Sequence, residues 1–335
     1  MILRIAMLVV GLLMGAAQAA PAAEKLNAYM NWTLHGQHGP WFVAKARGYF
    51  GQAGIDVTIQ RGYGSADTVK KVLTGVADVG FTDPLPIIIA VAEGQPIKAV
   101  MGGFMVEPCV LHSAAEQGNV RGPKDMEGKS MGGPPADVCI MLLRAAMEKA
   151  GADYSKVRIE NMDAPTRIPM LAAGRIDAAA DFVGSEILWE KALRAAGKRR
   201  VGFRYDQYIE KYGLMVVVGE KMIKEKPEVV RGMTLALLRG FQDHVKDPEM
   251  AANTILQAYP ELDRDYVHSS AGALLDVMWD ETTRAKGIGI LNPAKMRSTI
   301  EISAKYWKLP RKPAPEEVFT NEYIEWAHGQ LKGQR

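Results

Sequence analysis

Apolar or β-branched runs alternate with stretches of helical periodicity between residues 26 and 101. Residues 55–60 show the strict apolar–polar alternation of a half-buried strand, and Gly54 just before them is the stop of the preceding helix. The β-α-β-α-β-α-β order indicates a largely parallel sheet covered by helices. The predicted strands are 26–32, 55–60, 77–81 and 97–101, and the predicted helices are 40–53, 67–73 and 86–93.

A second, smaller α/β unit is predicted after the glycines at positions 102 and 103. Both units contain a helix end, a glycine and an aspartate that opens a strand, at 73–78 in the first and 171–177 in the second. This repetition indicates two lobes of similar construction. The second unit has predicted strands at 130–131, 157–161 and 178–181, and predicted helices at 137–150, 168–173 and 186–196.

From residue 227 the pattern changes to successive helices, each beginning near a proline or an aspartate. A last strand at 214–218 could rejoin the first sheet. The predicted fold is α/β with two lobes and a helical C-terminal section, and a cleft between lobes is a common place for a small-ligand site. The predicted helices are 227–246, 248–258, 263–278, 293–305 and 315–331.

Composition agrees with a folded protein of about two domains, because 48% of the 335 residues are hydrophobic and 24% are charged. These values exclude a disordered chain, a collagen-like fibre and a disulfide scaffold. The 41 basic residues against 38 acidic ones give a net charge of +3, without the basic excess typical of nucleic-acid-binding domains. We therefore expect no nucleic-acid partner.

Residues 1–19 predict a secretory signal peptide. Arg4 precedes an apolar run from residue 5 to about residue 17, and Ala17-Gln18-Ala19 has the small-residue pattern of a cleavage site. The run is shorter than the ~20 residues that span a bilayer, although an uncleaved anchor is the alternative. Export would permit a disulfide between Cys109 and Cys139, while two buried free thiols remain the other interpretation.

Motifs for catalysis and for metal or phosphate binding are incomplete. Ser130 lies in a G-x-S-x-G pattern, but two glycines and two prolines follow where a nucleophile elbow requires a helix. The glycine at 122 is one residue too far from Gly128-Lys129-Ser130 for a phosphate-binding loop. His35 and His38 lack the further ligands of a zinc site. We expect no catalytic residue, metal or cofactor, and the sequence favours binding over turnover.

Ligands in open parallel sheets lie beyond the carboxyl ends of the strands, close to helix N-termini. A tryptophan in such a position could stack on a planar ligand, although it could also belong to the core. Serine and aspartate there could simply cap helices, and the acidic residues could pair with surface lysines. The candidate ligand-binding residues are Asn31, Trp32, His35, His38, Tyr63, Gly64, Ser65, Thr82, Asp83, Pro135, Ala136, Asp137, Asp181, Phe182 and Glu186.

Residues 32–50, read together with Gly54-Ile55-Asp56-Val57, resemble the opening of periplasmic solute-binding proteins of ABC transporters. The resemblance is to the group that includes binders of thiamine pyrimidine precursors, sulfonates, taurine and nitrate. Residues 73–80, 124–129 and 171–177 are also similar to this family.

This resemblance implies a type II-like, two-lobed fold with two crossovers, near 102–108 and 202–212. Lobe 1 would comprise residues 20–105 and 210–335, and lobe 2 residues 106–209. The lobes would close over a small-molecule ligand by a hinge motion. A periplasmic location, a monomeric state and docking on an inner-membrane ABC permease are further expectations, and a sensing role is the alternative to transport.

Pyrimidine-binding members of the family typically carry W-x-x-N-x-x-H, which Trp32 and His38 match, with His35 at the asparagine position. No arginine stands at a predicted strand end to attract a sulfonate or nitrate, and the candidate carboxylates would repel a bare anion. A pyrimidine-type heteroaromatic or vitamin precursor is therefore favoured over a sulfonate, nitrate or aromatic carboxylate. A related enzyme that makes the thiamine pyrimidine is the rival class, but two cysteines cannot supply its cysteine-rich motif.

Overall fold

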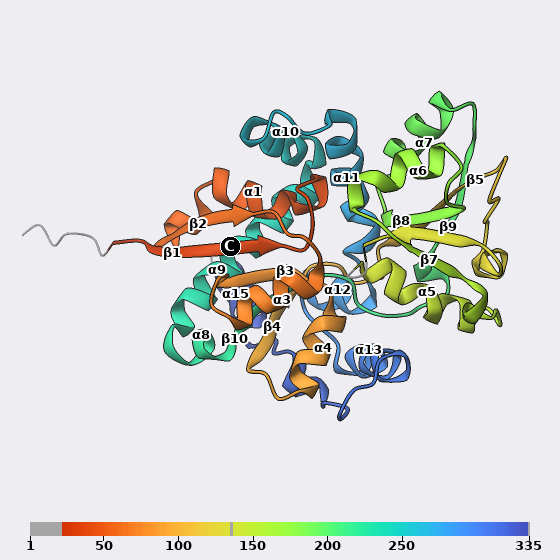
Figure 1. Ribbon diagram of the computed structural model, residues 1–335. Coiled ribbons are helices and arrows are strands. Elements are labelled where there is room, and N and C mark those ends of the chain that lie inside the picture. Colours follow the sequence, from red (N-terminus) through yellow and green to blue (C-terminus); the bar gives the residue numbers. More distant parts are fainter. Residues whose placement is uncertain (1–21, 135–136, 334–335) are drawn as a thin grey trace, which may run out of the picture.

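Two five-stranded mixed sheets form the framework of the computed structural model, which describes residues 22–134 and 137–333. They lie toward opposite ends of the molecule, with helices on their faces (Figure 1). The strand order is β2-β1-β3-β10-β4 in the first sheet and β7-β6-β8-β5-β9 in the second. The fold is thus α/β with two lobes. We call the parts built on these sheets the first lobe and the second lobe.

The first sheet combines parallel and antiparallel strands. Strands β1, β2 and β3 are parallel, as the alternation of strands and helices predicts. Strand β10 runs antiparallel between β3 and β4, so the last predicted strand does rejoin the first sheet. The strands are β1 (Glu24–Met30), β2 (Ile55–Gln60), β3 (Val79–Thr82), β4 (Ile97–Gly102) and β10 (Met215–Gly219).

One predicted helix of the first lobe is interrupted in the structure. The single helix predicted over 40–53 is two helices, because Gly48 adopts a φ of +71° in the left-handed region. Glycine takes this conformation readily and commonly ends a helix there. These elements are the 3-10 helix η1 (Gly36–His38) and helices α1 (Gly39–Ala46), α2 (Tyr49–Gln52), α3 (Ser65–Leu73) and α4 (Pro84–Ala92).

The second sheet contains two strands that the sequence pattern did not predict, β5 and β9. They pair antiparallel with each other, and β5 also pairs antiparallel with β8. Its elements are β5 (Cys109–Ala114), β6 (Ser130–Gly133), β7 (Arg158–Asn161), β8 (Ala178–Phe182) and β9 (Arg200–Arg204), with helices α5 (Val138–Lys149), α6 (Arg167–Ala172) and α7 (Glu186–Ala195), and 3-10 turns η2 (Pro123–Met126), η3 (Tyr154–Lys156) and η4 (Ala164–Thr166).

Two segments pass between the sheets, and we call them the first and second crossovers. The first comprises residues 103–108, between β4 and β5, and the second comprises residues 205–214, between β9 and β10. The second begins later than the predicted 202–212, because β9 continues to residue 204, and it contains η5 (Tyr205–Gln207). The lobe boundaries at 105/106 and 209/210 remain predictions, since the crossovers belong to neither sheet.

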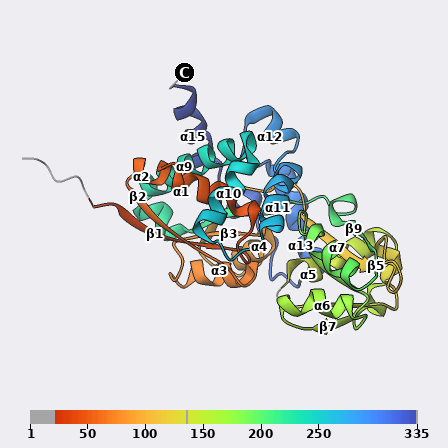
Figure 2. The same ribbon diagram turned by 90° about the horizontal axis from the view of Figure 1, so that it is seen from above.

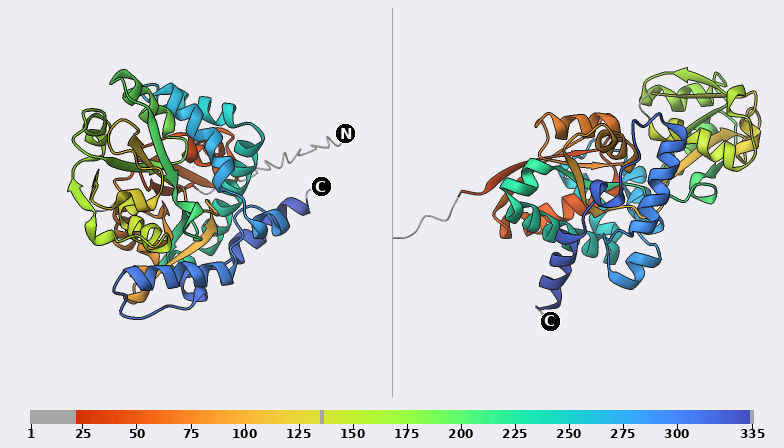
Figure 3. Two further views of the ribbon diagram at one scale, coloured as in Figure 1. Left: turned by 90° about the vertical axis from the view of Figure 1, so that its right-hand side faces the viewer. Right: turned by 90° about the horizontal axis from the view of Figure 1, so that it is seen from below.

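The C-terminal section is helical, as predicted. Helix α11 lies between the lobes, where it contacts η1 and α7, whereas α15 projects from the first lobe away from the second (Figures 1, 2 and 3). The helix predicted over 315–331 is two helices, because Phe319 is extended and bridges Ala99 of β4. The helices are α8 (Glu220–Glu225), α9 (Pro227–Lys246), α10 (Pro248–Ala258), α11 (Arg264–Val277), α12 (Glu281–Lys286), α13 (Pro293–Tyr306), α14 (Pro315–Val318) and α15 (Glu322–Lys332).

Within the described ranges, no helix is long and apolar enough to cross a membrane. The predicted signal peptide, residues 1–19, lies outside these ranges and stays a prediction.

Candidate functional site

A pocket between the lobes is lined by residues of both. The first lobe contributes the segment that follows β1 and the start of α3, while the second lobe contributes the end of β8 and the start of α5. These are strand ends and helix starts, the positions that the sequence indicated for a ligand. The lining residues are Asn31, Trp32, His35, Gly64, Ser65, Asp137, Val138, Cys139, Asp181 and Phe182.

Asn31 is held in the first-lobe wall by His38. The backbone N–H of His35 donates to His38 Nδ1 at 3.3 Å, so the imidazole proton lies on Nε2 and is donated to Asn31 Oδ1, 3.1 Å away. Since Oδ1 of Asn31 is occupied, its amide nitrogen is left as the donor toward a ligand. His38 itself is buried behind Asn31 and does not line the pocket.

The His35 ring forms part of the pocket wall. It stacks on Tyr266 of α11 with 5.5 Å between ring centroids, and its Nδ1 is 2.8 Å from the carbonyl oxygen of Thr33. The His38 ring meets it edge-on at 4.2 Å. Burial lowers the pKa of His35 and lowers the pKa of His38 well below its ordinary value of 6.5. Both rings are therefore neutral in the folded protein at neutral pH.

The neutral histidine pair gives a pH prediction. Because the pKa values of His35 and His38 are lowered by folding, these rings are protonated below pH 6.5 in the unfolded state while they remain neutral in the folded state. Their contribution to stability is therefore complete above pH 6.5 and is lost as the pH falls. Urea unfolding measures the free energy of unfolding. Between pH 6 and 5 this free energy should fall by about 1.4 kcal/mol per pH unit more in the wild type than in His38→Gln, which corresponds to the uptake of one additional proton on unfolding. Equal slopes would contradict the assignment.

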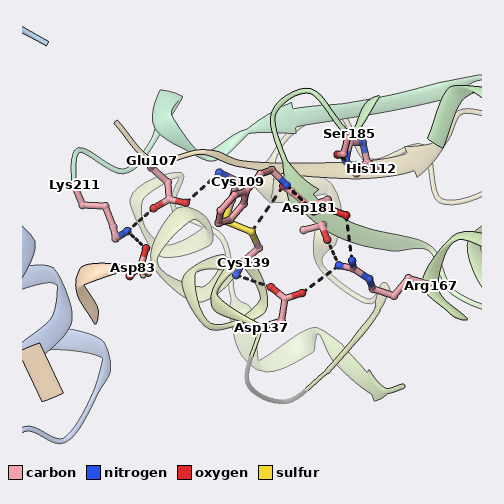
Figure 4. The surroundings of a disulfide bond; sticks show 12 residues. Asp83, Glu107, Cys109, His112, Asp137, Cys139, Arg167, Asp181, Ser185 and Lys211 are labelled. Carbon is pink, nitrogen blue, oxygen red and sulfur yellow. Dashed lines mark hydrogen bonds and ion pairs between the residues drawn. A yellow bond between two sulfur atoms is a disulfide. The ribbon is translucent and has the colours of Figure 1, made fainter. Parts of the chain in front are cut away.

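An ion cluster that we call the acidic wall forms the second-lobe side of the pocket (Figure 4). Arg167 donates from Nη1 to Asp137 Oδ2 and from Nη2 to Asp181 Oδ2, both at 3.1 Å. Its Nη1 also donates to the carbonyl oxygen of Ala180. Two carboxylates against one guanidinium leave one negative charge in excess. Burial raises the pKa of Asp137, although Arg167 opposes this shift.

Backbone groups position both carboxylates of the acidic wall. Asp137 caps α5, and its Oδ1 accepts the N–H of Cys139 at 2.8 Å. Asp181 stands near the end of β8, and its Oδ1 accepts the N–H of Phe182 at 2.9 Å. The remaining lone pairs of these oxygens can accept hydrogen bonds from a ligand in the pocket.

Arg167 reaches the site although no arginine stands at a predicted strand end. The sequence-based prediction rests on the residues directly at strand ends, whereas Arg167 begins α6, six residues after the end of β7. Its position immediately before the predicted helix 168–173 was the signal that could have identified it. Its guanidinium carbon lies 5.6 Å from the centre of the Trp32 ring, a cation–π contact between the lobes.

A second contact near the pocket also joins the lobes. The side-chain amide of Gln37 in η1 donates to the carbonyl oxygen of Val183, just after β8, at 3.0 Å. The neighbouring Gly36 N–H donates to Ser270 Oγ of α11 at 2.8 Å. The lobes therefore touch in this structure.

The other candidate residues that the structure describes do not line the pocket. Thr82 Oγ1 donates to the carbonyl oxygen of Ser65, and the Asp83 N–H donates to Ser65 Oγ, so both fix a lining residue. Glu186 accepts the N–H of Gly184, and Tyr63 is 64% exposed. Pro135 and Ala136 lie outside the described residues.

Cys109 and Cys139 form a disulfide with their Cα atoms 5.6 Å apart (Figure 4). The bond connects the start of β5 to the start of α5, and Cys139 lines the pocket. The structure thus decides between the two interpretations of the cysteines that the sequence left open.

A buried Ser185–His112 pair in the second lobe has the wrong tautomer for nucleophilic catalysis. His112 Nε2 is 3.2 Å from Ser185 Oγ, and its Nδ1 is 3.1 Å from Nη1 of Arg200. A guanidinium only donates, so Nδ1 accepts and the ring proton on Nε2 faces the serine. A general base would have to accept the serine proton at that nitrogen, so this pair cannot activate the hydroxyl.

Comparison with known proteins identifies the family. The sequence profile described as "NMT1/THI5 like" matches residues 35–251, which is more than half of the chain. The chain belongs to the NMT1/THI5-like family. The matched segment includes the pocket residues from His35 to Phe182, so the family similarity extends over both walls of the site.

Proteins with similar sequences differ in the function that their names give. A formylaminopyrimidine-binding protein of Halalkalibacterium halodurans is 24% identical over 270 residues, covering 79% of this chain and 80% of the relative. The riboflavin-binding protein RibY of Chloroflexus aurantiacus is 24% identical over 321 residues, covering 92% and 88%. A 4-amino-5-hydroxymethyl-2-methylpyrimidine phosphate synthase of Uromyces fabae is 22% identical over 320 residues, covering 91% and 89%.

The fold is shared with solved periplasmic binding proteins. The aliphatic sulphonate binding protein SsuA of Escherichia coli superposes with a TM-score of 0.69 at 13% identity, covering 91% of this chain and all of that chain. At this identity the similarity establishes the architecture alone, and it confirms the periplasmic-binding-protein fold that the sequence predicts.

Proposed function

We propose that this protein is the extracytoplasmic solute-binding component of an ABC importer and captures a small heteroaromatic ligand between its lobes. The observation that carries the proposal is the pocket itself, because an aromatic ring and an amide donor on one lobe face carboxylate acceptors on the other. A ligand that contacts both walls stabilises the closed arrangement of the lobes over the open one.

The two walls favour a planar ligand that both accepts and donates hydrogen bonds. The free amide of Asn31 matches a ring nitrogen or a carbonyl oxygen, while Asp137 and Asp181 match an amino group or a protonated ring nitrogen. Trp32 offers a face for stacking. An aminopyrimidine has all of these features, and the formylaminopyrimidine-binding relative supports this class. The excess negative charge of the acidic wall disfavours a bare sulfonate or nitrate.

Further features support an exported importer component. A disulfide is typical of proteins in oxidising compartments, which agrees with the predicted signal peptide and a periplasmic location. We infer that lobe 1 (20–105 and 210–335) and lobe 2 (106–209) move as two bodies about the crossovers. The closed form would then dock on an inner-membrane permease as a monomer.

Synthase relatives make an enzyme of the same fold the second candidate. Cys109 and Cys139 are joined to each other, so neither is available as a free thiolate for the cysteine-rich motif that the resemblance assigns to the related enzyme. The tautomer of His112, whose ring proton faces Ser185, also argues against nucleophilic catalysis by this serine. We therefore favour binding without chemical conversion of the ligand.

Thermal unfolding in the presence of a ligand panel tests the proposal. The panel contains formylaminopyrimidine, 4-amino-5-hydroxymethyl-2-methylpyrimidine, riboflavin, an alkanesulfonate, nitrate and benzoate. A pyrimidine at a hundred times its Kd should stabilise the protein by about 2.7 kcal/mol, seen as a higher Tm, and mass spectrometry should recover it unchanged. A response confined to the anions would overturn the ligand class, and recovery of a converted product would revive the enzyme.

A further inference from the structure

A buried ion triad joins the two crossovers to the first lobe (Figure 4). Lys211 on the second crossover donates from Nζ to Glu107 Oε2 on the first crossover at 2.5 Å and to Asp83 Oδ2 at 2.7 Å. Its third proton is directed to the carbonyl oxygen of Tyr212, 2.7 Å away. The three charged side chains are at most 1% exposed. We call Asp83, Glu107 and Lys211 the crossover triad.

The crossover triad is connected to both lobes by backbone hydrogen bonds. Glu107 Oε1 accepts the N–H of Cys109, the first residue of β5 in the second lobe, at 3.1 Å. In the first lobe, Asp83 Oδ1 caps α4 by accepting the N–H of Leu85 at 2.8 Å. Lys211 is therefore the single cation in a chain of contacts that runs from the first lobe, through both crossovers, to the second lobe.

Lys211 is needed to compensate the charge of two buried carboxylates. Burial raises the pKa of Glu107, Lys211 opposes this shift and the charge of Asp83 adds to it. An unpaired buried charge is strongly unfavourable, so a movement that separates Lys211 from either carboxylate is opposed. The triad is complete in a structure in which the lobes touch, at Trp32–Arg167 and Gln37–Val183.

We propose that Lys211 is a positioning residue for lobe closure, which holds the two crossovers in the geometry that brings the lobes together. The proposal rests on the proposed function in one respect, since closure matters because it encloses a ligand. The lining residues bind the ligand, whereas Lys211 acts through the crossovers and sets how much of the ligand-free protein is already closed. The apparent affinity for the ligand rises in proportion to this closed fraction.

The test is the distance between the lobes in the ligand-free, full-length mature protein. Spin labels on Lys70→Cys in α3 and Lys149→Cys in α5, both exposed in the wild type, report this distance by double electron–electron resonance. The wild type should show a short-distance population, and Lys211→Met should raise the ratio of long to short distances at least fivefold. A wild type without a short-distance population, or a folded Lys211→Met variant with an unchanged ratio, overturns the proposal.

Two further variants separate positioning from loss of fold. Lys211→Met leaves two uncompensated carboxylates, so the variant Asp83→Asn/Glu107→Gln/Lys211→Met removes every charge of the triad and keeps a capping side chain at 83. It should fold and show the same shift toward long distances, and a wild-type ratio in it overturns the proposal. Lys156→Met breaks an ion pair with Glu127 at the edge of the second lobe and should leave the ratio unchanged; an equal shift in this control also overturns it.

The outcome is independent of the ligand panel. If no panel compound binds, the proposed function fails while the ligand-free distance ratio still tests Lys211. If a pyrimidine binds and the ratio is unchanged, the proposed function stands and the role of Lys211 fails.

Discussion

Replacing Arg167 by methionine is expected to destabilise the protein by about 3–5 kcal/mol, because it leaves Asp137, which is buried, and Asp181, which is mostly buried, without their common cation. Arg167 is only 4% exposed, so water cannot readily replace its hydrogen bonds to Asp137 and Asp181. Methionine retains the apolar part of the side chain, so the loss reports the missing charge and hydrogen bonds. Urea unfolding at pH 7 measures the change in the free energy of unfolding.

Arg144→Met is the matched control for this prediction. Arg144 also pairs with a carboxylate of the second lobe, Glu148, but its side chain is 52% exposed. Exposed pairs of this kind contribute at most about 1 kcal/mol. In Arg167→Met, adding Asp181→Asn should restore part of the loss by removing one uncompensated charge. If Arg167→Met and Arg144→Met were equally stable, Arg167 would not be the buried cation that holds the two carboxylates of the acidic wall.

Replacing Trp32 by alanine is expected to weaken binding of the pyrimidine by two to three orders of magnitude, about 3–4 kcal/mol. The indole lines the pocket, where its face can stack on a planar ligand, and it faces Arg167 across the site. Trp32 is only partly buried, so the free energy of unfolding should change little. Isothermal titration calorimetry with the pyrimidine that raises the Tm most measures the loss.

Two variants calibrate the result for Trp32. Trp32→Phe keeps an aromatic face and should bind within about tenfold of the wild type. Trp326→Ala removes a partly buried tryptophan of α15 far from the pocket and should bind normally. Unfolding of Trp32→Ala would instead mean that this side chain belongs to the core and that the site lies elsewhere.

The sequence predicted elements well where a single period dominated. The alternation of residues 55–60 and the helical stretches 227–246 and 248–258 coincide with β2, α9 and α10. Strands β5 and β9 escaped because polar residues interrupt them: His112 and Ser113 stand in β5, and arginines begin and end β9. Their strand character comes from pairing with each other and from burial, which depend on tertiary contacts.

The candidate site was predictable as far as strand ends and helix starts determine it. Asn31, Trp32, Asp137 and Asp181 were expected near a ligand, and they line one pocket. Arg167 was missed because it lies six residues after the end of β7, away from the strand end itself. The disulfide depends on the distance in space between two cysteines that are 30 positions apart in the sequence, which spacing along the chain does not determine. The position of His38 behind Asn31 depends on how the chain turns after β1, which the sequence pattern does not determine either.

The central claim is that the cleft between the lobes binds a small heteroaromatic molecule on Trp32 and the acidic wall. Native mass spectrometry of the protein, purified from the cells that produce it without added ligand, tests this claim most directly. We predict an adduct with the mass of a pyrimidine-type molecule on the wild type and no adduct on Trp32→Ala. An adduct that persists in Trp32→Ala, or an anion as the bound species, would contradict it.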